Sequence, residues 1–266
     1  MALGEHWIDA ASFTTLRLGS GAVMLMVITA ISHRKNVRHL KVGWNAAIML
    51  FLYAIAFSFS YLQLSAGTGA LLLFGSVQVT MILVALKQGE KPQPLEWRGL
   101  CVASIGLIYL ILPGIAAPPI VGSILMIVAG IAWGMYTLFG RGIQSPLDYT
   151  TVNFMRAALF AVGVSLLRIN TVHITLSGMI LALLSGALAS GLGYTIWYAA
   201  LKGLTATRAA TVQLAVPAIA AIGGVLFLQE MLTLRLIVAS LTILGGIGMA
   251  ILGRKITPEK PNESKP

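Results

Sequence analysis

Two glutamines are the polar side chains best placed to bind a small molecule in this chain. Gln78 and Gln213 each lie in the middle of a long apolar segment, at about 68–86 and 205–228. An amide both donates and accepts hydrogen bonds, so it could hold an amino acid or a similar metabolite. An amide without a partner is costly in apolar surroundings. The same residues therefore also fit a structural role, a hydrogen bond between helices worth about 1 kcal/mol or less.

Four aromatic residues are further candidates for binding a small molecule. Trp133 lies deep in its apolar segment and is the best of them to line a cavity. Tyr61, Trp197 and Tyr198 lie toward the ends of their segments, where anchoring at a membrane surface is the more common role. We keep all four as candidate substrate-binding residues.

Residues that break helices mark candidate gating positions. Pro217 lies inside 205–228 and leaves a carbonyl four residues earlier without its helical partner, so the helix can bend there. Gly191 and Gly193 loosen the preceding segment. Broken helices often mark transport sites in membranes, but they also occur for packing alone.

An Asp-x7-Arg pair occurs twice in this sequence. Asp9 and Arg17 are followed 139 positions later by Asp148 and Arg156, each pair at the mouth of an apolar segment. A buried guanidinium could meet an anionic substrate, but a long arginine side chain also reaches from a helix to the membrane surface. We therefore expect both arginines to be structural anchors.

The apolar segments that carry these residues place the protein in a membrane. Of its 266 residues 58% are hydrophobic and only 10% are charged, which excludes an ordinary water-facing surface. Runs long enough to cross about 30 Å of hydrocarbon as helices recur along the chain. We predict an all-α integral membrane protein with nine transmembrane helices, at about 13–32, 42–64, 68–86, 97–113, 120–140, 150–167, 177–200, 205–228 and 233–252.

The distribution of basic residues predicts the orientation in the cytoplasmic (inner) membrane. The net charge of +10 is spread over alternate loops, which argues against a nucleic-acid partner and for orientation by positive charge. If the basic loop 33–41 is cytoplasmic, the opposite loops hold only Arg168 and Arg235. The carboxyl terminus is then cytoplasmic and the amino terminus extracytoplasmic. The other basic residues on the cytoplasmic side are Lys87, Lys91, Arg98, Arg141, Lys202, Arg208, Arg254, Lys255, Lys260 and Lys265.

The 139-residue offset divides the chain into two repeats. Residues 10–112 form a first repeat that lacks its first helix, residues 120–252 a complete second repeat, and residues 253–266 a disordered cytoplasmic tail. Because a complete unit holds five helices, the two units cross the membrane in opposite senses, giving a 4+5 arrangement of inverted-topology repeats from an original 5+5. Two explanations of the gap remain open: an internal methionine taken as the start, which we favour, or a genuine nine-helix variant.

An ordered set of motifs is present in both halves. The second half carries Thr205-x-Thr207-x-Ala209-Ala210, Val216-Pro217, Gln229-Glu230-x-Leu232-Thr233 and Gly245-Gly246-Ile247-Gly248, and the first half carries 67–78 and Gly89-Glu90. Together these motifs, over about residues 10–252, resemble the EamA-type domain of the drug/metabolite transporter superfamily. The resemblance implies a ten-helix secondary transporter of the inner membrane, usually an exporter of metabolites.

No arrangement of residues in the sequence favours an enzyme. There is no set of histidine, cysteine and carboxylate at metal spacing and no phosphate-binding loop, so we expect neither metal nor cofactor. Glu90 and Glu230 precede the last helix of each half and are expected to be helix caps. We predict a transporter that exports small metabolites, amino acids or drugs by alternating access. The alternative is a truncated, non-transporting membrane protein or subunit. The partners expected are a small-molecule substrate and the lipid bilayer, and the sequence leaves a homodimer open.

Overall fold

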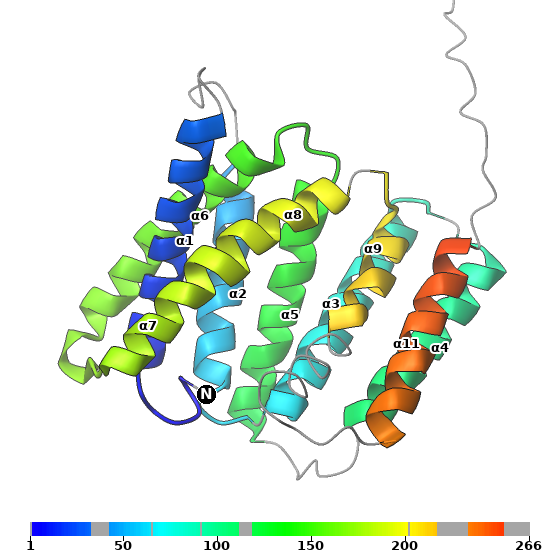
Figure 1. Cartoon of the computed structure of the whole chain (residues 1–266), viewed down its shortest axis with the longest axis horizontal. Coiled ribbons are helices and arrows are strands. Elements are labelled where there is room, and N and C mark those ends of the chain that lie inside the picture. The colour runs from blue at the N-terminus through cyan, green and yellow to red at the C-terminus, as the bar shows by residue number, and fades with distance from the viewer. Residues whose placement is uncertain are drawn as a thin grey trace, which may run out of the picture. The chain divides into compact units, whose positions relative to one another are not determined.

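The protein is all-helical over the residues described in the computed structural model, which are 2–32, 43–64, 66–90, 92–111, 119–201, 203–216 and 234–252 (Figure 1). The one β-type pairing in these ranges is the isolated bridge between Ile8 and Ile174. The helices are α1 (Ala10–Ser32), α2 (Trp44–Ser60), α3 (Ala66–Lys87), α4 (Pro94–Ile111), α5 (Ile120–Gly140), α6 (Pro146–Leu167), the 3₁₀ turn η2 (Ile169–Thr171), α7 (Leu176–Leu184), the π-helical segment η3 (Ser185–Leu192), α8 (Gly193–Ala200), α9 (Ala206–Gln213) and α11 (Leu234–Leu252).

Several of these helices are long and apolar enough to cross a membrane. Four reach that length within the described residues: Ala10–Ile31, Ile120–Gly140, Pro146–Leu167 and the continuous span Leu176–Ala200. Three shorter apolar helices accompany them, Trp44–Ser60, Leu72–Lys87 and Ser240–Ala250. The protein is therefore an all-α, multi-pass membrane protein. The count of nine spans and the inverted repeats stay predictions. Pro217, Glu230 and the tail 253–266 lie outside the described residues.

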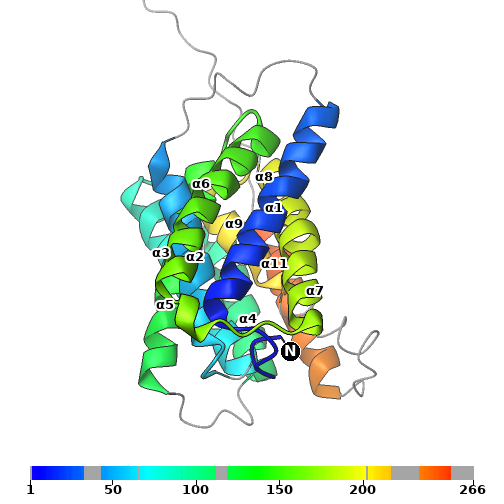
Figure 2. The same ribbon diagram turned by 90° about the vertical axis from the view of Figure 1, so that its left-hand side faces the viewer.

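The chain divides into two compact units. Unit 1 comprises Met1–Glu90 and Ile111–Ala210, and unit 2 comprises Lys91–Leu110 and Thr211–Pro266. In unit 1, α5 packs against α2 and α3, and α1 packs against α6, α7 and η3. Both views show α1 beside α6 and α7 (Figures 1 and 2). Helices that are far apart in the sequence therefore pack against one another in unit 1.

In unit 2, α4 and α11 approach each other at glycines. A Cβ atom added at Gly99 would lie 2.5 Å from the carbonyl oxygen of Gly246, and one added at Gly246 would lie 2.5 Å from the amide nitrogen of Ala103. Only residues without a side chain let two backbones come this close, which is a common way for helices to pack in lipid. The close contact between α4 and α11 therefore requires Gly99 and Gly246.

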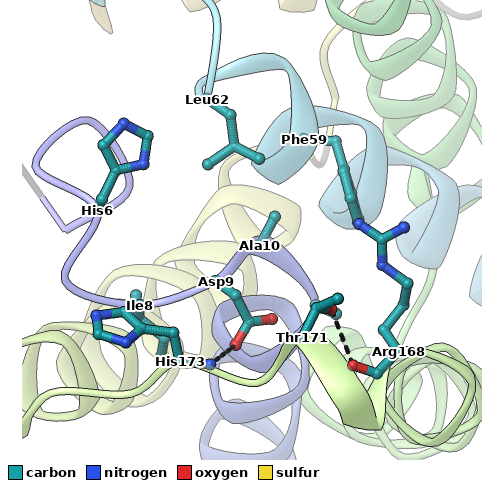
Figure 3. A pocket seen from close by; sticks show the side chains of 10 residues that line it. His6, Ile8, Asp9, Ala10, Phe59, Leu62, Arg168, Thr171 and His173 are labelled. Atoms are coloured by element: carbon teal, nitrogen blue, oxygen red, sulfur yellow. Dashed lines mark hydrogen bonds between the residues drawn. The ribbon is translucent and has the colours of Figure 1, made fainter.

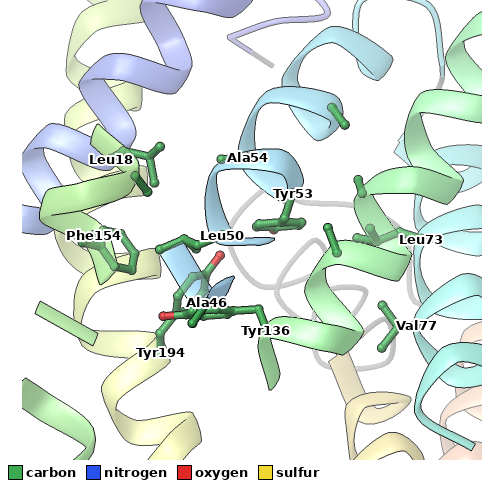
Figure 4. Close-up of a cluster of buried hydrophobic side chains, with 14 of the residues drawn as sticks. Leu18, Ala46, Leu50, Tyr53, Ala54, Leu73, Val77, Tyr136, Phe154 and Tyr194 are labelled. Carbon is green, nitrogen blue, oxygen red and sulfur yellow. The ribbon is translucent and has the colours of Figure 1, made fainter. Parts of the chain in front are cut away.

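The main core of unit 1 is a cluster of buried side chains from α1, α2, α3, α5, α6, α8 and α9, and a smaller cluster lies around Ile8 and Phe13. Leu50, Met126 and Phe154 are fully buried in the main core, so these side chains pack against other parts of the protein and not against lipid. Tyr53, Tyr136 and Tyr194 enter the same interior from three different helices, as Figure 4 shows. Tyrosines are unusual in a core because each hydroxyl needs a partner there. This polar content inside an apolar cluster marks the candidate site.

The span that faces α1 changes its helical pitch in the middle. Residues Ser185–Leu192 form a π-helical segment between α7 and α8, and Gly186 and Gly191 lie within it. At Gly186 the backbone lies directly against α1, where an added Cβ would collide with the side chain of Ser20 and the carbonyl group of Arg17. Such π-helical turns occur frequently at functional sites. The gating role of Gly191 and Gly193 stays a prediction.

Candidate functional site

A buried arginine forms the centre of the candidate site in unit 1. The Arg17 side chain on α1 is only 7% exposed. Its Nε donates a hydrogen bond to Ser190 Oγ at 2.9 Å, and its Nη2 donates to the hydroxyl oxygens of Tyr53 at 3.2 Å and Tyr194 at 3.1 Å. The guanidinium carbon lies 5.4 Å from the ring centre of Tyr53 and 5.1 Å from that of Phe57. Arg17 is thus held by three hydroxyl groups and two ring faces.

The partners of Arg17 are all neutral. An ion pair joins Arg141 to Glu90, whereas no ion pair to Arg17 is found among the described residues. A charge removed from water is normally paired with an opposite charge. Hydroxyl groups and aromatic faces stabilise a guanidinium only in part. The interior of unit 1 therefore holds a positive charge that no described residue neutralises.

Helix geometry explains how η3 and α8 bring three of these groups together. Ser190, Tyr194 and Tyr198 are spaced four residues apart, so they project from similar sides of successive turns. Ser190 and Tyr194 meet Arg17, and Tyr198 donates a hydrogen bond of 2.8 Å to the backbone carbonyl of Tyr136. This face of the span therefore supplies the polar contacts, while Gly186 lets it approach α1.

Aromatic rings extend from Arg17 in both directions. We call this series the aromatic row. Its members, in order, are Tyr61, Phe57, Tyr53, Trp133, Tyr136, Tyr198 and Tyr149, with Tyr194 packed beside Trp133. Successive ring centres lie 4.7 to 5.8 Å apart, within the range of favourable aromatic contacts. The row runs from the end of α2 to the beginning of α6, and the guanidinium lies over Phe57 and Tyr53.

The structure brings together three of the predicted binding residues. Trp133, Tyr61 and Tyr198 belong to the aromatic row. Trp197 is half-buried against the same core, and its indole N–H has no hydrogen-bond partner in the described ranges. Which of these residues contacts a substrate stays a prediction.

The two glutamines are both buried, as their positions in the sequence suggested. Gln78 is 8% exposed on α3 in unit 1, and Gln213 is 5% exposed at the end of α9 in unit 2. Each has an interaction partner in the structure. The two roles considered for these glutamines, a hydrogen bond within the protein and a contact with the substrate, therefore both remain predictions.

Arg17 does not reach out of the protein as a side chain at a membrane surface would, because it is buried in unit 1; its expected role as a structural anchor stays a prediction. Arg156 does fit an anchor: it is partly exposed, lies 4.5 Å from the ring centre of Trp44, and donates to the Gly43 carbonyl at 3.3 Å. The sequence interpretation weighed Arg17 for anion binding but set it aside, and it did not name the partners Tyr53 and Ser190. A signal was present, because Arg17 is the one charged residue of α1.

Glu90 links three helix ends at one side of unit 1. Its carboxylate accepts hydrogen bonds from Arg141 at 2.7 Å and from the amide nitrogens of Ala206 at 3.0 Å and Thr207 at 3.4 Å. Burial opposes ionisation, but Arg141 and the two N–H groups outweigh it and lower the pKa of Glu90. Glu90 is thus a helix cap, but of α9, which lies more than a hundred residues further along the chain, and not of the neighbouring α4.

The substitution Glu90→Gln is expected to destabilise the protein at neutral pH by about 1 kcal/mol, since it removes the ion pair and weakens the cap. Because the folded-state pKa of Glu90 is lowered, this contribution is present above the unfolded-state pKa and is lost as the pH falls through the folded value. Thermal unfolding of the wild-type and Glu90→Gln proteins in detergent, measured from neutral pH down to about pH 2, well below the ordinary pKa of a glutamate, checks this. A difference that does not shrink on acidification would contradict it.

A pocket lies where α1 begins (Figure 3). It has a volume of about 290 Å³ and is lined by His6, Ile8, Asp9, Ala10, Ala11, Phe59, Leu62, Arg168, Thr171 and His173. Asp9 accepts hydrogen bonds from the amides of Ser12 at 2.9 Å and His173 at 3.1 Å. Burial opposes its ionisation, but these bonds lower its pKa. Asp9 is therefore used as the cap of α1. No group of three possible metal ligands occurs among the described residues.

Long apolar helices around a buried polar centre define a multi-pass membrane protein with a polar interior, and sequence comparison identifies it as a transporter. The EamA-like transporter family matches residues 120–252, and the chain belongs to this family. An uncharacterized protein of Pseudomonas aeruginosa is 50% identical over 253 residues, covering 95% of this chain and 88% of that protein. The threonine/homoserine exporter RhtA of Escherichia coli K12 is 28% identical over 265 residues, covering 97% and 86%.

Other comparisons agree with this assignment. A probable amino-acid metabolite efflux pump of Salmonella typhimurium is 23% identical over 232 residues, covering 82% of this chain and 78% of that one. One crystal structure of a protein aligns with a TM-score of 0.79 at 16% identity, covering 95% of this chain and 91% of the other. This likeness shows that the fold is shared.

Proposed function

We propose that this protein is a secondary transporter that exports small amino acids or similar metabolites across the cytoplasmic membrane. The observation that carries the proposal is the buried Arg17 with its three hydroxyl partners inside a membrane domain. Ionisable groups within membrane helices are costly and are mostly kept for substrate or ion pathways. Relatives named as exporters of threonine and homoserine and of amino-acid metabolites support the same class of substrate.

Alternating access is the mechanism we propose for this export. The repeated Asp-x7-Arg pairs and the five-helix period favour two halves of opposite orientation, and inverted repeats commonly move against each other about a central site. The π-helical segment beside Arg17 is a natural place for such movement, because its hydrogen bonds are already irregular. The aromatic row would then offer the substrate a surface of ring faces and hydroxyls.

Efflux from cells tests the proposal. Cells that overproduce the protein and are loaded with radiolabelled L-threonine, L-homoserine or other amino acids are expected to lose label faster than cells carrying an empty vector. A defined control is the Arg17→Gln variant at equal membrane abundance, which is expected to abolish the difference. If wild-type protein causes no efflux across a broad panel, the transport proposal fails and the alternative, a membrane protein that does not transport, is favoured.

A further inference from the structure

We infer that Arg17 binds the carboxylate of the transported molecule, so that the substrates are small carboxylates, amino acids among them. This inference rests on the proposed transport function and adds the group that is recognised. Arg17 is then a ligand-binding residue and not a structural one. Three observations support this role: the hydrogen-bond donors that Arg17 leaves unused, the absence of a neutralising charge around it among the described residues, and its contrast with Arg156.

The guanidinium of Arg17 keeps hydrogen-bonding capacity. Arginine has five N–H donors, one on Nε and two on each terminal nitrogen. The bonds to Ser190, Tyr53 and Tyr194 use the donor of Nε and both donors of Nη2. Within the described part of the chain, Nη1 makes no further hydrogen bond, which leaves its two donors for a ligand. A carboxylate oxygen is the acceptor that such a group binds most strongly.

The charge balance of the site favours an anionic ligand group. Burying a guanidinium without an anion is unfavourable. No described carboxylate forms an ion pair with Arg17; Asp9 caps α1, Glu90 pairs with Arg141, and Asp148 is buried at the start of α6. A substrate carboxylate would neutralise the site on binding. Differential binding of this kind gives a carrier a reason to change conformation only when it is loaded, because the empty and loaded sites differ by one unit of charge.

The groups around Arg17 suit the rest of a small amino acid. The hydroxyls of Tyr53 and Tyr194 accept from the guanidinium and can still donate their own protons to a carboxylate. Trp133 lies 5.1 Å from Tyr53 and 4.6 Å from Tyr194, ring centre to ring centre. Aromatic faces attract an ammonium group as well as apolar atoms. A zwitterion could thus place its carboxylate on Arg17 and its ammonium group over these rings.

Arg156 provides a control within the same chain. It has the same spacing from an aspartate as Arg17 but is partly exposed at Trp44 and Gly43, where it can keep contact with the membrane surface. If position in the Asp-x7-Arg pair decided the role, the two arginines would behave alike. The inference requires that only Arg17 affects ligand recognition.

Binding by the purified full-length protein tests this inference separately from transport. Thermal shifts are measured with L-threonine, L-homoserine and a panel of other small carboxylates, and with the matched primary amides, which lack the anionic oxygen. The wild-type protein is expected to bind the acids at least about 10-fold more tightly than the amides, the range for a charge-assisted hydrogen bond. Arg17→Gln is expected to remove this preference, and Arg156→Gln is expected to retain it.

The outcomes separate the two proposals. Equal binding of acids and amides by the wild type, no binding of any carboxylate, or an acid preference kept in Arg17→Gln would each overturn the inference. If the wild type still shows efflux when one of these binding results is found, the proposed transport function is retained and only the role of Arg17 is rejected. Arg17→Lys guards against misfolding of the glutamine variant, because it keeps the positive charge and is expected to keep a weaker acid preference. A purely structural arginine would leave the acid-to-amide ratio unchanged in every variant that folds.

Discussion

Replacing Gly186 with alanine is expected to lower the thermal stability of the protein and to abolish transport. The added methyl group would collide with the side-chain oxygen of Ser20 and with the carbonyl oxygen of Arg17, and it would lie 2.8 Å from the carbonyl carbon of Arg17. Backbone atoms of a packed helix cannot move away as a flexible side chain can, so η3 must shift from α1. Overpacking of this kind costs about 1 to 3 kcal/mol or more.

Transport is expected to suffer beyond the loss of stability, because the contact at Gly186 sets the position of Ser190 against Arg17. The shift would separate Arg17 Nε from Ser190 Oγ, now 2.9 Å apart. The measurements are the unfolding temperature in detergent and the efflux of a labelled substrate at equal abundance in the membrane. Both are expected to fall.

Gly193 is the matched control for Gly186, since it lies in the same membrane span just after η3. An added Cβ at Gly193 would meet no atom within 4 Å. Gly193→Ala is therefore expected to leave the unfolding temperature unchanged or to raise it slightly, because alanine favours a helix over glycine by up to about 1 kcal/mol. If Gly186→Ala proves as stable as Gly193→Ala, the close contact between α1 and η3 is not a feature of the protein.

Hydropathy was sufficient to predict where most of the helices lie. The range predicted as 120–140 is the range of α5, and the one predicted as 177–200 agrees with the span Leu176–Ala200 within one residue. Apolar length decides these limits, because lipid accepts only segments that satisfy their own backbone. The segment predicted as 42–64 ends earlier, at Ser60, because Tyr61 to Leu64 form a turn that remains apolar.

The features that could not be predicted from the sequence are those that depend on contacts between residues far apart in the chain. Arg17 looked like a surface anchor because the sequence shows only its own helix. Its partners Tyr53, Ser190 and Tyr194 lie 36, 173 and 177 positions away. Glu90 was correctly expected to be a cap, but nothing local shows that it caps α9. Trp133, deep in an apolar segment, is partly buried among the rings of the aromatic row, and its contact with a substrate stays a prediction.

Arg17→Met is expected to stabilise the folded protein while it abolishes transport. Methionine has a similar length and no charge, so the cost of burying an unneutralised guanidinium disappears. The hydroxyls of Tyr53 and Tyr194 lose a donor, but both accept from the same nitrogen of Arg17 and are therefore close enough for one to donate to the other after a small movement. Replacement of buried charged groups by apolar ones often stabilises proteins, and about 1 to 2 kcal/mol is expected here. Thermal unfolding in detergent, without added ligand, measures it.

The sign of this change distinguishes the two roles of Arg17. A structural arginine holds α1, α2 and α8 together, so its removal would lower the unfolding temperature and contradict the prediction. A binding arginine is kept at the expense of stability, as polar groups at functional sites commonly are. Adding a saturating carboxylate sharpens the comparison, because ligand that binds only the folded state raises its stability. The wild type should then gain stability and Arg17→Met should not. The difference between their unfolding temperatures should therefore shrink as the ligand concentration rises, and at high enough concentration the wild type should become the more stable protein.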